Sequence, residues 1–309
     1  MRLLVVGAGS TGGYFGARLA RAGRDVTFLV RPTRAAQLRS NGLEVKSPHG
    51  DFTVTPTLVT SDRLEKKFDL VLLAVKAYAL EPALDDFAPA MDSTTMVLPL
   101  LNGIRHVELL KQRFGAPAVI GGVCRVATTL DDDGRIVQLA PFHELAYGEM
   151  NGERTPRLTR VHEFLSGAGF DTELSDTVEQ DMWEKWVLLA ALGGIVCLMR
   201  GNIGEIVAAP GGPDFVQRFL AEVVAAVTAA DHAPRPRFLD LTRKLLLERG
   251  SALTSSMYRD LQQGRPVEAE QILGDLLARA QHSAVATPLI AAAYAQLCVY
   301  QSQRNTGAS

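Results

Sequence analysis

Three glycines near the start of the chain have the spacing of a phosphate-binding loop. Gly7, Gly9 and Gly12 form a G-x-G-x-x-G pattern between an apolar run and an amphipathic helical segment. In such a loop the first glycine permits a tight turn, and the second lets the backbone approach the pyrophosphate of a dinucleotide. The third lets the helix pack closely on the strand. A purely structural turn is the alternative. The predicted cofactor contacts in the loop are Gly7, Ala8, Gly9, Ser10, Thr11 and Gly12.

An arginine follows the second apolar run, at the position where NAD-specific sites usually place an acid. Arg31 is followed by Pro32 and, shortly after, by Arg34. The planar guanidinium matches the geometry of a ribose 2′-phosphate, so Arg31 favours NADP over NAD. A solvated surface arginine is the alternative.

Two further polar residues end apolar runs, at Lys76 and Asn102. In doubly wound sheets ligands bind beyond the carboxyl ends of the strands. Lys76 could meet a phosphate or a substrate carboxylate, or lie in an exposed loop. Asn102 precedes Gly103, so it could also form an ordinary turn.

A lysine stands between two tryptophans at the head of an apolar helical run. Lys185 lies four residues after Asp181, which is the spacing of a helical ion pair. A helix that is apolar all round must be buried, so the lysine is also a candidate proton donor at the wall of a cleft.

The composition describes a globular protein that binds small molecules. The 309 residues are 47% apolar and 21% charged, and the net charge of −2 favours neither nucleic acid nor an anionic membrane. The three cysteines form no metal-ligand pattern, which predicts a reducing cytoplasm and no metal site. The first apolar run, in MRLLVVGAG, is too short for a signal peptide or a membrane span.

The two halves of the chain differ in the secondary structure that their sequence patterns predict. The first alternates β-rich and helical runs, which predicts an α/β doubly wound parallel sheet of the Rossmann type. Its predicted strands are RLLVVG, DVTFLV, FDLVLLAV and TTMVLPL, followed by an antiparallel hairpin around an Asp-Asp-Asp-Gly turn. The second half contains long helical patterns. We expect an NADP-binding domain over residues 1–174 and a helical substrate domain over residues 175–309.

Taken in order, these motifs resemble the ketopantoate reductase (2-dehydropantoate 2-reductase) family over nearly the whole chain. The most specific segments are GAGSTGG, AVKAY, LLNGI, WEKW and SSMYRDLQQGRPVEAE. The resemblance implies a cytoplasmic NADP-dependent oxidoreductase acting on CH-OH, which reduces a 2-keto acid to its 2-hydroxy acid in pantothenate biosynthesis. It also implies a C-terminal domain like that of 6-phosphogluconate dehydrogenase.

The resemblance also implies roles for individual residues. Lys185 matches the catalytic general acid, and Glu268 matches a cleft glutamate near nicotinamide and substrate. Ser256 matches a serine that contacts the substrate carboxylate. Without the resemblance to the family, Glu268 would be interpreted as a first-turn helix glutamate and Ser256 as an ordinary helix serine. Three more residues match cleft positions, Lys76 and Asn102 near cofactor and substrate and Ala127 as a backbone contact to the cofactor.

The chain departs from the family where the substrate is held. Leu189 and Gly193 replace two asparagines that follow the catalytic lysine, and Ile203 replaces a third, with Asn202 one place earlier. This favours, as alternatives, a reductase of a different keto acid or ketone, or a non-catalytic NADP-binding sensor. The last helix is apolar enough to pack on its own domain or on a second chain in a homodimer.

Overall fold

The computed structural model describes residues 1–65 and 67–306, which form two compact units. The first unit contains Met1–Leu101 and His106–Glu179, and the second contains Asn102–Arg105 and the chain from Gln180 onward. The predicted domain boundary, after residue 174, lies a few residues earlier. Val178 explains the difference, because its side chain packs on Gly121 and Gly148 of the first unit.

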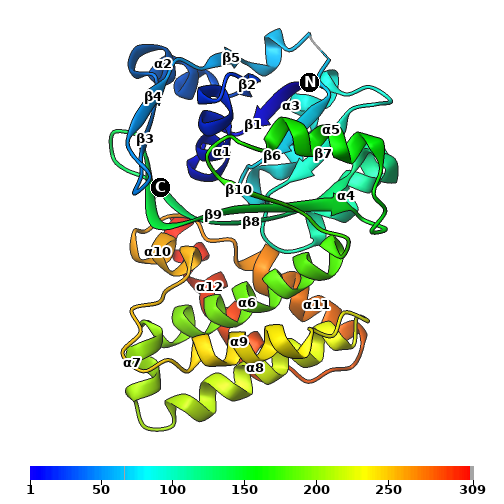
Figure 1. Ribbon diagram of the computed structural model, residues 1–309. Coiled ribbons are helices and arrows are strands. Elements are labelled where there is room, and N and C mark those ends of the chain that lie inside the picture. Colours follow the sequence, from blue (N-terminus) through cyan, green and yellow to red (C-terminus); the bar gives the residue numbers. More distant parts are fainter. Residues whose placement is uncertain (66, 307–309) are drawn as a thin grey trace. The chain divides into compact units, whose positions relative to one another are not determined.

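The first unit is built on a parallel sheet in the order β5-β2-β1-β6-β7 (Figure 1). Its strands are β1 (Arg2–Val6), β2 (Asp25–Leu29), β5 (Thr57–Val59), β6 (Leu70–Leu73) and β7 (Met96–Pro99). The four predicted runs are confirmed as β1, β2, β6 and β7. Every residue of β6 and β7 is buried, as expected for strands covered on both faces.

The predicted hairpin is confirmed, but it extends a second sheet rather than the parallel one. Strands β8 (Ile120–Leu130) and β9 (Ile136–Glu149) pair antiparallel. The second sheet has the order β10-β9-β3-β4, with β3 (Leu43–Lys46), β4 (Phe52–Val54) and β10 (Asp171–Leu174). Strand β9 is long enough to pair with β8, β3 and β10. The hairpin is linked to β7 of the parallel sheet by a single bridge, between Val97 and Val119, the residue before β8.

Helices pack against these sheets. They are α1 (Ser10–Arg21), α2 (Pro32–Asn41), α3 (Leu80–Phe87), α4 (Arg105–Phe114) and α5 (Pro156–Leu165), with 3₁₀ turns η1 (Ser61–Arg63), η2 (Ala77–Ala79), η3 (Ala88–Ala90) and η4 (Ala116–Ala118). Helix α1 contacts β1 and β2 of one sheet and β8 and β9 of the other. Its close approach to β2 needs Gly16, because a Cβ there would lie 2.5 Å from the Phe28 ring.

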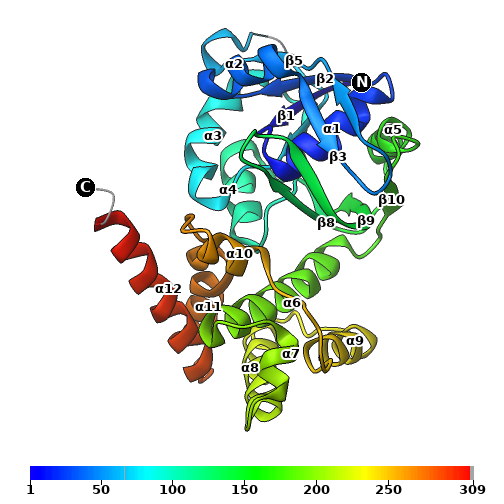
Figure 2. The same ribbon diagram turned by 90° about the vertical axis from the view of Figure 1, so that its left-hand side faces the viewer.

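The second unit is helical, as predicted (Figure 2). Its helices are α6 (Val178–Met199), α7 (Ile203–Ala208), α8 (Gly212–Thr228), α9 (Pro236–Leu246), α10 (Ser256–Gln262), α11 (Asp275–His282) and α12 (Pro288–Thr306). Helix α8 packs on α7, α11 and α12. Helix α6 is long and apolar enough to cross a membrane, but 72% of its apolar window is buried inside the protein, which identifies it as a core helix.

One helix of this unit is not a regular α-helix throughout. The segment AEQILGDLLARAQ begins with a π-helix, η5 (Glu270–Gly274), and continues as α11. The amide of Asp275 donates to the carbonyl of Glu270, a five-residue step in place of the usual four. The apolar spacing of a short π-helix resembles that of an α-helix, so the sequence pattern did not reveal it.

Candidate functional site

The predicted phosphate-binding loop lies between β1 and the first turn of α1. Gly7 has φ of +97°, a left-handed value that favours glycine. A Cβ on Gly12 would lie 2.3 Å from the Gly7 carbonyl oxygen, so glycine is required there for the helix to approach the loop. Both glycines therefore have the structural roles that the sequence predicted.

The remaining loop residues leave room for an anion. A Cβ built on Gly9, the N-cap of α1, would meet no atom within 4 Å. Ser10 and Thr11 form the start of α1 and are half-buried, and the first turn of the helix carries no acidic side chain. Free backbone amides and the positive end of the helix dipole attract phosphate at such a position. The residues present thus fit the pyrophosphate of a dinucleotide.

Arg31 lies next to this loop. Leu29 is aligned with Val6 in the parallel register, and the Leu29 carbonyl accepts a hydrogen bond of 3.2 Å from the Gly7 amide. Arg31 follows two residues later as the exposed N-cap residue of α2. Its side chain is therefore within the neighbourhood where a dinucleotide ribose would be expected.

Arg34, for which the sequence predicted no role, also lies against the loop. Its Nε donates to the Ala8 carbonyl at 3.3 Å and its Nη1 to Oε1 of Gln37 at 2.5 Å. Its Nη2 is buried and has no hydrogen-bond partner within the described chain. Burial lowers the pKa of Arg34. The signal in the sequence was its position three residues after Arg31, one helical turn away.

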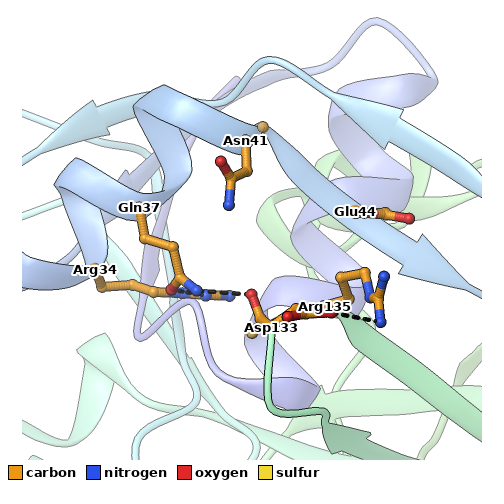
Figure 3. Close-up of a pocket in the computed structure, with 8 residues that line it drawn as sticks. Arg34, Gln37, Asn41, Glu44, Asp133 and Arg135 are labelled. Carbon is orange, nitrogen blue, oxygen red and sulfur yellow. Dashed lines mark hydrogen bonds and ion pairs between the residues drawn. The ribbon is translucent and has the colours of Figure 1, made fainter.

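A polar cavity of about 270 Å³ lies beyond Arg34, between α2, β3 and the turn of the β8–β9 hairpin (Figure 3). Gln37 donates from Nε2 to the Asp133 carbonyl at 2.8 Å, and Arg135 pairs with Asp133 at 2.8 Å. None of the predicted site residues lines this cavity. Its contribution to the site is indirect, because the hairpin turn holds Gln37 and Gln37 holds Arg34.

Lys76 and Ala127 are the other predicted cofactor contacts in the first unit. Lys76 is exposed at the N-cap of η2, directly after Val75, whose Cγ1 would lie 3.1 Å from a Cβ on Gly7. Ala127 falls at the register shift between Val126 and Thr128, a β-bulge in β8. Bulges release backbone groups from the ladder and are common beside active sites. This geometry suits the backbone contact predicted for Ala127.

In the helical unit, Lys185 is half-buried on α6 between two buried tryptophans. Trp183 stacks on His232 with ring centroids 4.1 Å apart. Trp186 donates from Nε1 to the Ile272 carbonyl at 2.9 Å. Arg279 lies over both rings, at 5.5 and 5.8 Å from their centroids. The Trp186 indole is therefore bonded to the backbone of a distant segment, whereas the Trp183 ring stacks on His232.

The acids beside Lys185 share an arginine that the sequence did not indicate. Arg235 binds Asp181 and also Glu184, with Nε to Glu184 Oε1 at 2.8 Å. Burial alone would raise the pKa of Glu184, but the hydrogen bonds from Arg235 outweigh it and lower the pKa. The predicted ion pair between Asp181 and Lys185 stays a prediction.

Asn102 and Glu268 both lie beside the π-helix η5. Asn102 is half-buried and precedes Gly103, which has φ of +78°. A Cβ on Gly103 would lie 2.8 Å from the Gln271 carbonyl oxygen. Glu268 is 7% exposed, and its carbonyl accepts from the Ile272 amide at 3.0 Å. The two residues are thus held against the same short helix.

Ser256 is exposed in the first turn of α10, whereas its neighbour Ser255 is the buried N-cap and accepts from the Tyr258 amide at 3.0 Å. Gly193 of α6 packs against the same segment, since a Cβ there would lie 2.9 Å from the Met257 methyl group and 3.9 Å from Ser255 Oγ. The place where the family asparagine was expected is therefore filled by Met257.

The departure at position 203 is also explained by local structure. Asn202 is the N-cap of α7 and forms a capping box: its side chain accepts from the Glu205 amide at 2.9 Å, and the Glu205 carboxylate accepts from the Asn202 amide at 2.8 Å. Ile203 is fully buried. Since Asn202 is occupied in the cap, it does not replace the missing asparagine at position 203.

Family models match most of the chain. Residues 3–152 match the family model of ketopantoate reductase PanE/ApbA, and residues 177–301 match the model of its C-terminal region. The chain is 34% identical over 304 residues to "Uncharacterized oxidoreductase YkpB" of Bacillus subtilis (strain 168), covering 98% of this chain and 100% of the relative. It is 29% identical to 2-dehydropantoate 2-reductase of Nostoc sp., covering 98% and 96%.

A solved structure, 2-dehydropantoate 2-reductase from Geobacter metallireducens GS-15, has the same fold. Its TM-score is 0.85 at 28% sequence identity, with 96% of this chain and 99% of that chain covered. The similarity therefore extends over both units, including the helical one that carries Lys185.

Proposed function

Since the chain belongs to the ketopantoate reductase family, we propose that it uses NADPH to reduce ketopantoate or a related 2-oxo acid to the 2-hydroxy acid. One observation carries the cofactor half of the proposal. Gly9 faces open space at the amino end of α1, with Gly7 and Gly12 shaping the loop around it. Such a cradle binds a pyrophosphate through backbone amides.

The chain's own residues account for the rest of the reaction. NADPH, when bound, supplies the hydride that adds to the carbonyl carbon. Lys185 Nζ donates a proton to the carbonyl oxygen, which completes the alcohol. Ser256 and Asn102 offer a hydroxyl and an amide to hold the substrate, and the buried Glu268 orients the site.

The preference for NADPH rests on two guanidinium groups beside the loop. Arg31 is exposed at the end of β2, and Arg34 holds a buried Nη2 without a partner within the described residues. Arginine binds phosphate by paired hydrogen bonds, so a 2′-phosphate would supply the missing acceptor. Titrating the protein with NADPH and with NADH tests this, and tighter binding of NADH would contradict it.

A second candidate substrate class is favoured by the apolar side of α6. Leu189 is half-buried, and Met257 fills the space beside Gly193. A site that lacks donors for a substrate hydroxyl loses its preference for hydroxylated substrates. We therefore include 2-oxo acids with an apolar side chain, or related ketones, as candidates.

Steady-state rates with NADPH on a panel of 2-oxo acids separate these possibilities. Ketopantoate as clearly the best substrate would dispose of the apolar class. Absence of NADPH oxidation with every carbonyl compound would favour the non-catalytic sensor. The proposal includes a cytoplasmic location, which the free thiols Cys124, Cys197 and Cys298 support, and homodimerisation, which sedimentation would test.

A further inference from the structure

The π-helix η5 contacts Glu268 and the residues that follow Lys185 and Asn102, which are three predicted site residues. Trp186, which follows Lys185, donates its indole N–H to the Ile272 carbonyl at 2.9 Å, and the bond is buried. Gly103, which follows Asn102, packs on the Gln271 carbonyl. Glu268 lies in the turn that leads into η5 and accepts from the Ile272 amide. All of these residues belong to the second unit.

The backbone of η5 is irregular where these contacts are made. In an α-helix each interior carbonyl accepts from the amide four residues later. The π-turn changes this step to five, as the bond from Asp275 to Glu270 shows. The Ile272 carbonyl, which accepts from Trp186 of α6, lies within this irregular segment. π-turns within helices occur frequently at functional sites.

The outer side of η5 is also held in place. Glu270 pairs with Arg105 at 3.6 Å and accepts a hydrogen bond from the Tyr294 hydroxyl of α12. A Cβ on Gly274 would lie 2.6 Å from Glu270 Oε2, so the glycine leaves space for this carboxylate. The helix is therefore fixed both on the side of α6 and on the side of α12.

We propose that η5 is the element that sets the mutual positions of Lys185, Asn102 and Glu268, with Trp186 as the positioning residue for the proton donor. This inference rests on the proposed function. The indole bond fixes α6 one residue from Lys185, and Gly103 fixes the turn one residue from Asn102. A hydrogen bond lost on this helix displaces the proton donor relative to the carboxylate of Glu268.

The test is the variant Trp186→Phe, which keeps an aromatic ring and removes the N–H. A displacement of about 1 Å can cost on the order of 10²-fold in rate, so we expect kcat to fall about tenfold or more. KM for NADPH stays within about twofold, since the phosphate loop lies in the other unit. The kinetic isotope effect with deuterated NADPH increases, because the chemical step becomes slower.

Trp183→Phe is the matched control. Trp183 is buried on the same helix, at 4% exposure, and its ring stacks on His232, which lies outside η5. The variant Trp183→Phe loses the same ring volume as Trp186→Phe, so we expect a similar fall in Tm. We expect its kcat and isotope effect to stay within about twofold of the wild-type values. If Trp186→Phe does not fold, Tyr294→Phe takes its place, with a smaller change in the same direction expected.

The outcomes distinguish the two proposals. One outcome would overturn the role of η5 alone. In it, the wild type turns over, Lys185→Ala abolishes this turnover, and Trp186→Phe keeps both the turnover and the isotope effect of the wild type. The same holds for Tyr294→Phe where it replaces the first variant. No turnover by the wild type on any 2-oxo acid would overturn the proposed function and this inference with it.

Discussion

Arg235 binds the buried carboxylate of Glu184 through three hydrogen bonds. The Arg235 backbone amide and Nε both donate to Oε1 at 2.8 Å, and Nη2 donates to Oε2 at 2.5 Å. Glu184 is 4% exposed and immediately precedes Lys185. A carboxylate in such surroundings is stable only with its partner, so this pair helps to fix the start of α6.

Replacement of Arg235 by methionine is expected to destabilise the protein by about 2 kcal/mol. The value is below the 3–5 kcal/mol typical of fully buried pairs because about half of the Arg235 side chain is exposed. Urea denaturation gives the free energy of unfolding. Arg243→Met is the control, since Arg243 pairs with the exposed Asp240 and its loss should cost at most about 0.5 kcal/mol. Equal effects of the two variants would contradict the prediction.

Lys185→Ala is expected to lower kcat by on the order of 10²-fold or more, the usual effect of removing a general acid. The measurement is steady-state turnover with NADPH and the best 2-oxo acid of the panel. Lys244→Ala removes an exposed lysine of α9 and should leave kcat unchanged. Unchanged turnover by Lys185→Ala would refute the assignment of Lys185 as proton donor.

Arg34→Ala is expected to weaken NADPH binding about tenfold and to change NADH binding much less. The reason is that a hydrogen bond to a charged group contributes roughly 1.5–3 kcal/mol, and about 1.4 kcal/mol is a factor of ten. Fluorescence titration gives both Kd values. Arg39→Ala, at an exposed position in the last turn of α2, is the control. Equal losses for both cofactors would assign Arg34 to support of the loop through Ala8 only.

Leu189→Asn is expected to shift specificity towards hydroxylated substrates. The change returns a polar group to the face of α6 that carries Lys185, one helical turn away. We expect the ratio of kcat/KM for ketopantoate over 3,3-dimethyl-2-oxobutanoate, which lacks the hydroxyl group, to rise about tenfold. A matched Leu189→Met variant should leave the ratio near that of wild type. No difference between the two variants would place Leu189 outside the substrate site.

From the surroundings of His143 we predict that the protein loses stability at mildly acidic pH. Burial, with His49 and Arg18 nearby, lowers its pKa from the ordinary value of 6.5. Its ring stacks on His49 at 4.0 Å, and Nδ1 lies 2.7 Å from the Tyr14 hydroxyl. Below pH 6.5 the unfolded chain therefore binds more protons at this histidine than the folded chain does. The contribution of His143 to the free energy of unfolding is complete above about pH 6.5 and decreases as the pH falls through that value.

Denaturation curves at pH 7.5 and pH 5.5 measure this effect. We expect the wild type to lose more stability between the two values than His143→Gln, which cannot titrate. His282→Gln, at the exposed end of α11, is the control and should behave like the wild type. The same pH dependence in wild type and His143→Gln would contradict the prediction.

Much of the fold followed from local patterns. The apolar runs identified β1, β2, β6 and β7, because the burial of a strand depends on residues close in sequence. The second sheet was not predicted. Its strands β3 and β10 pair with β9 across long separations, and they are too short to give a strong pattern of their own.

The sequence by itself determined the parts of the candidate site that depend on spacing. These are the glycine loop, Arg31 beside it, and Lys185 between two tryptophans, since each is set by residues within a few positions of one another. The tertiary structure decided the contacts that join distant segments. It placed Arg34 against Ala8, Met257 beside Gly193, Arg235 on Glu184, and Trp186 on the carbonyl of Ile272. These pairings depend on how segments distant in the sequence pack together, which no local periodicity encodes.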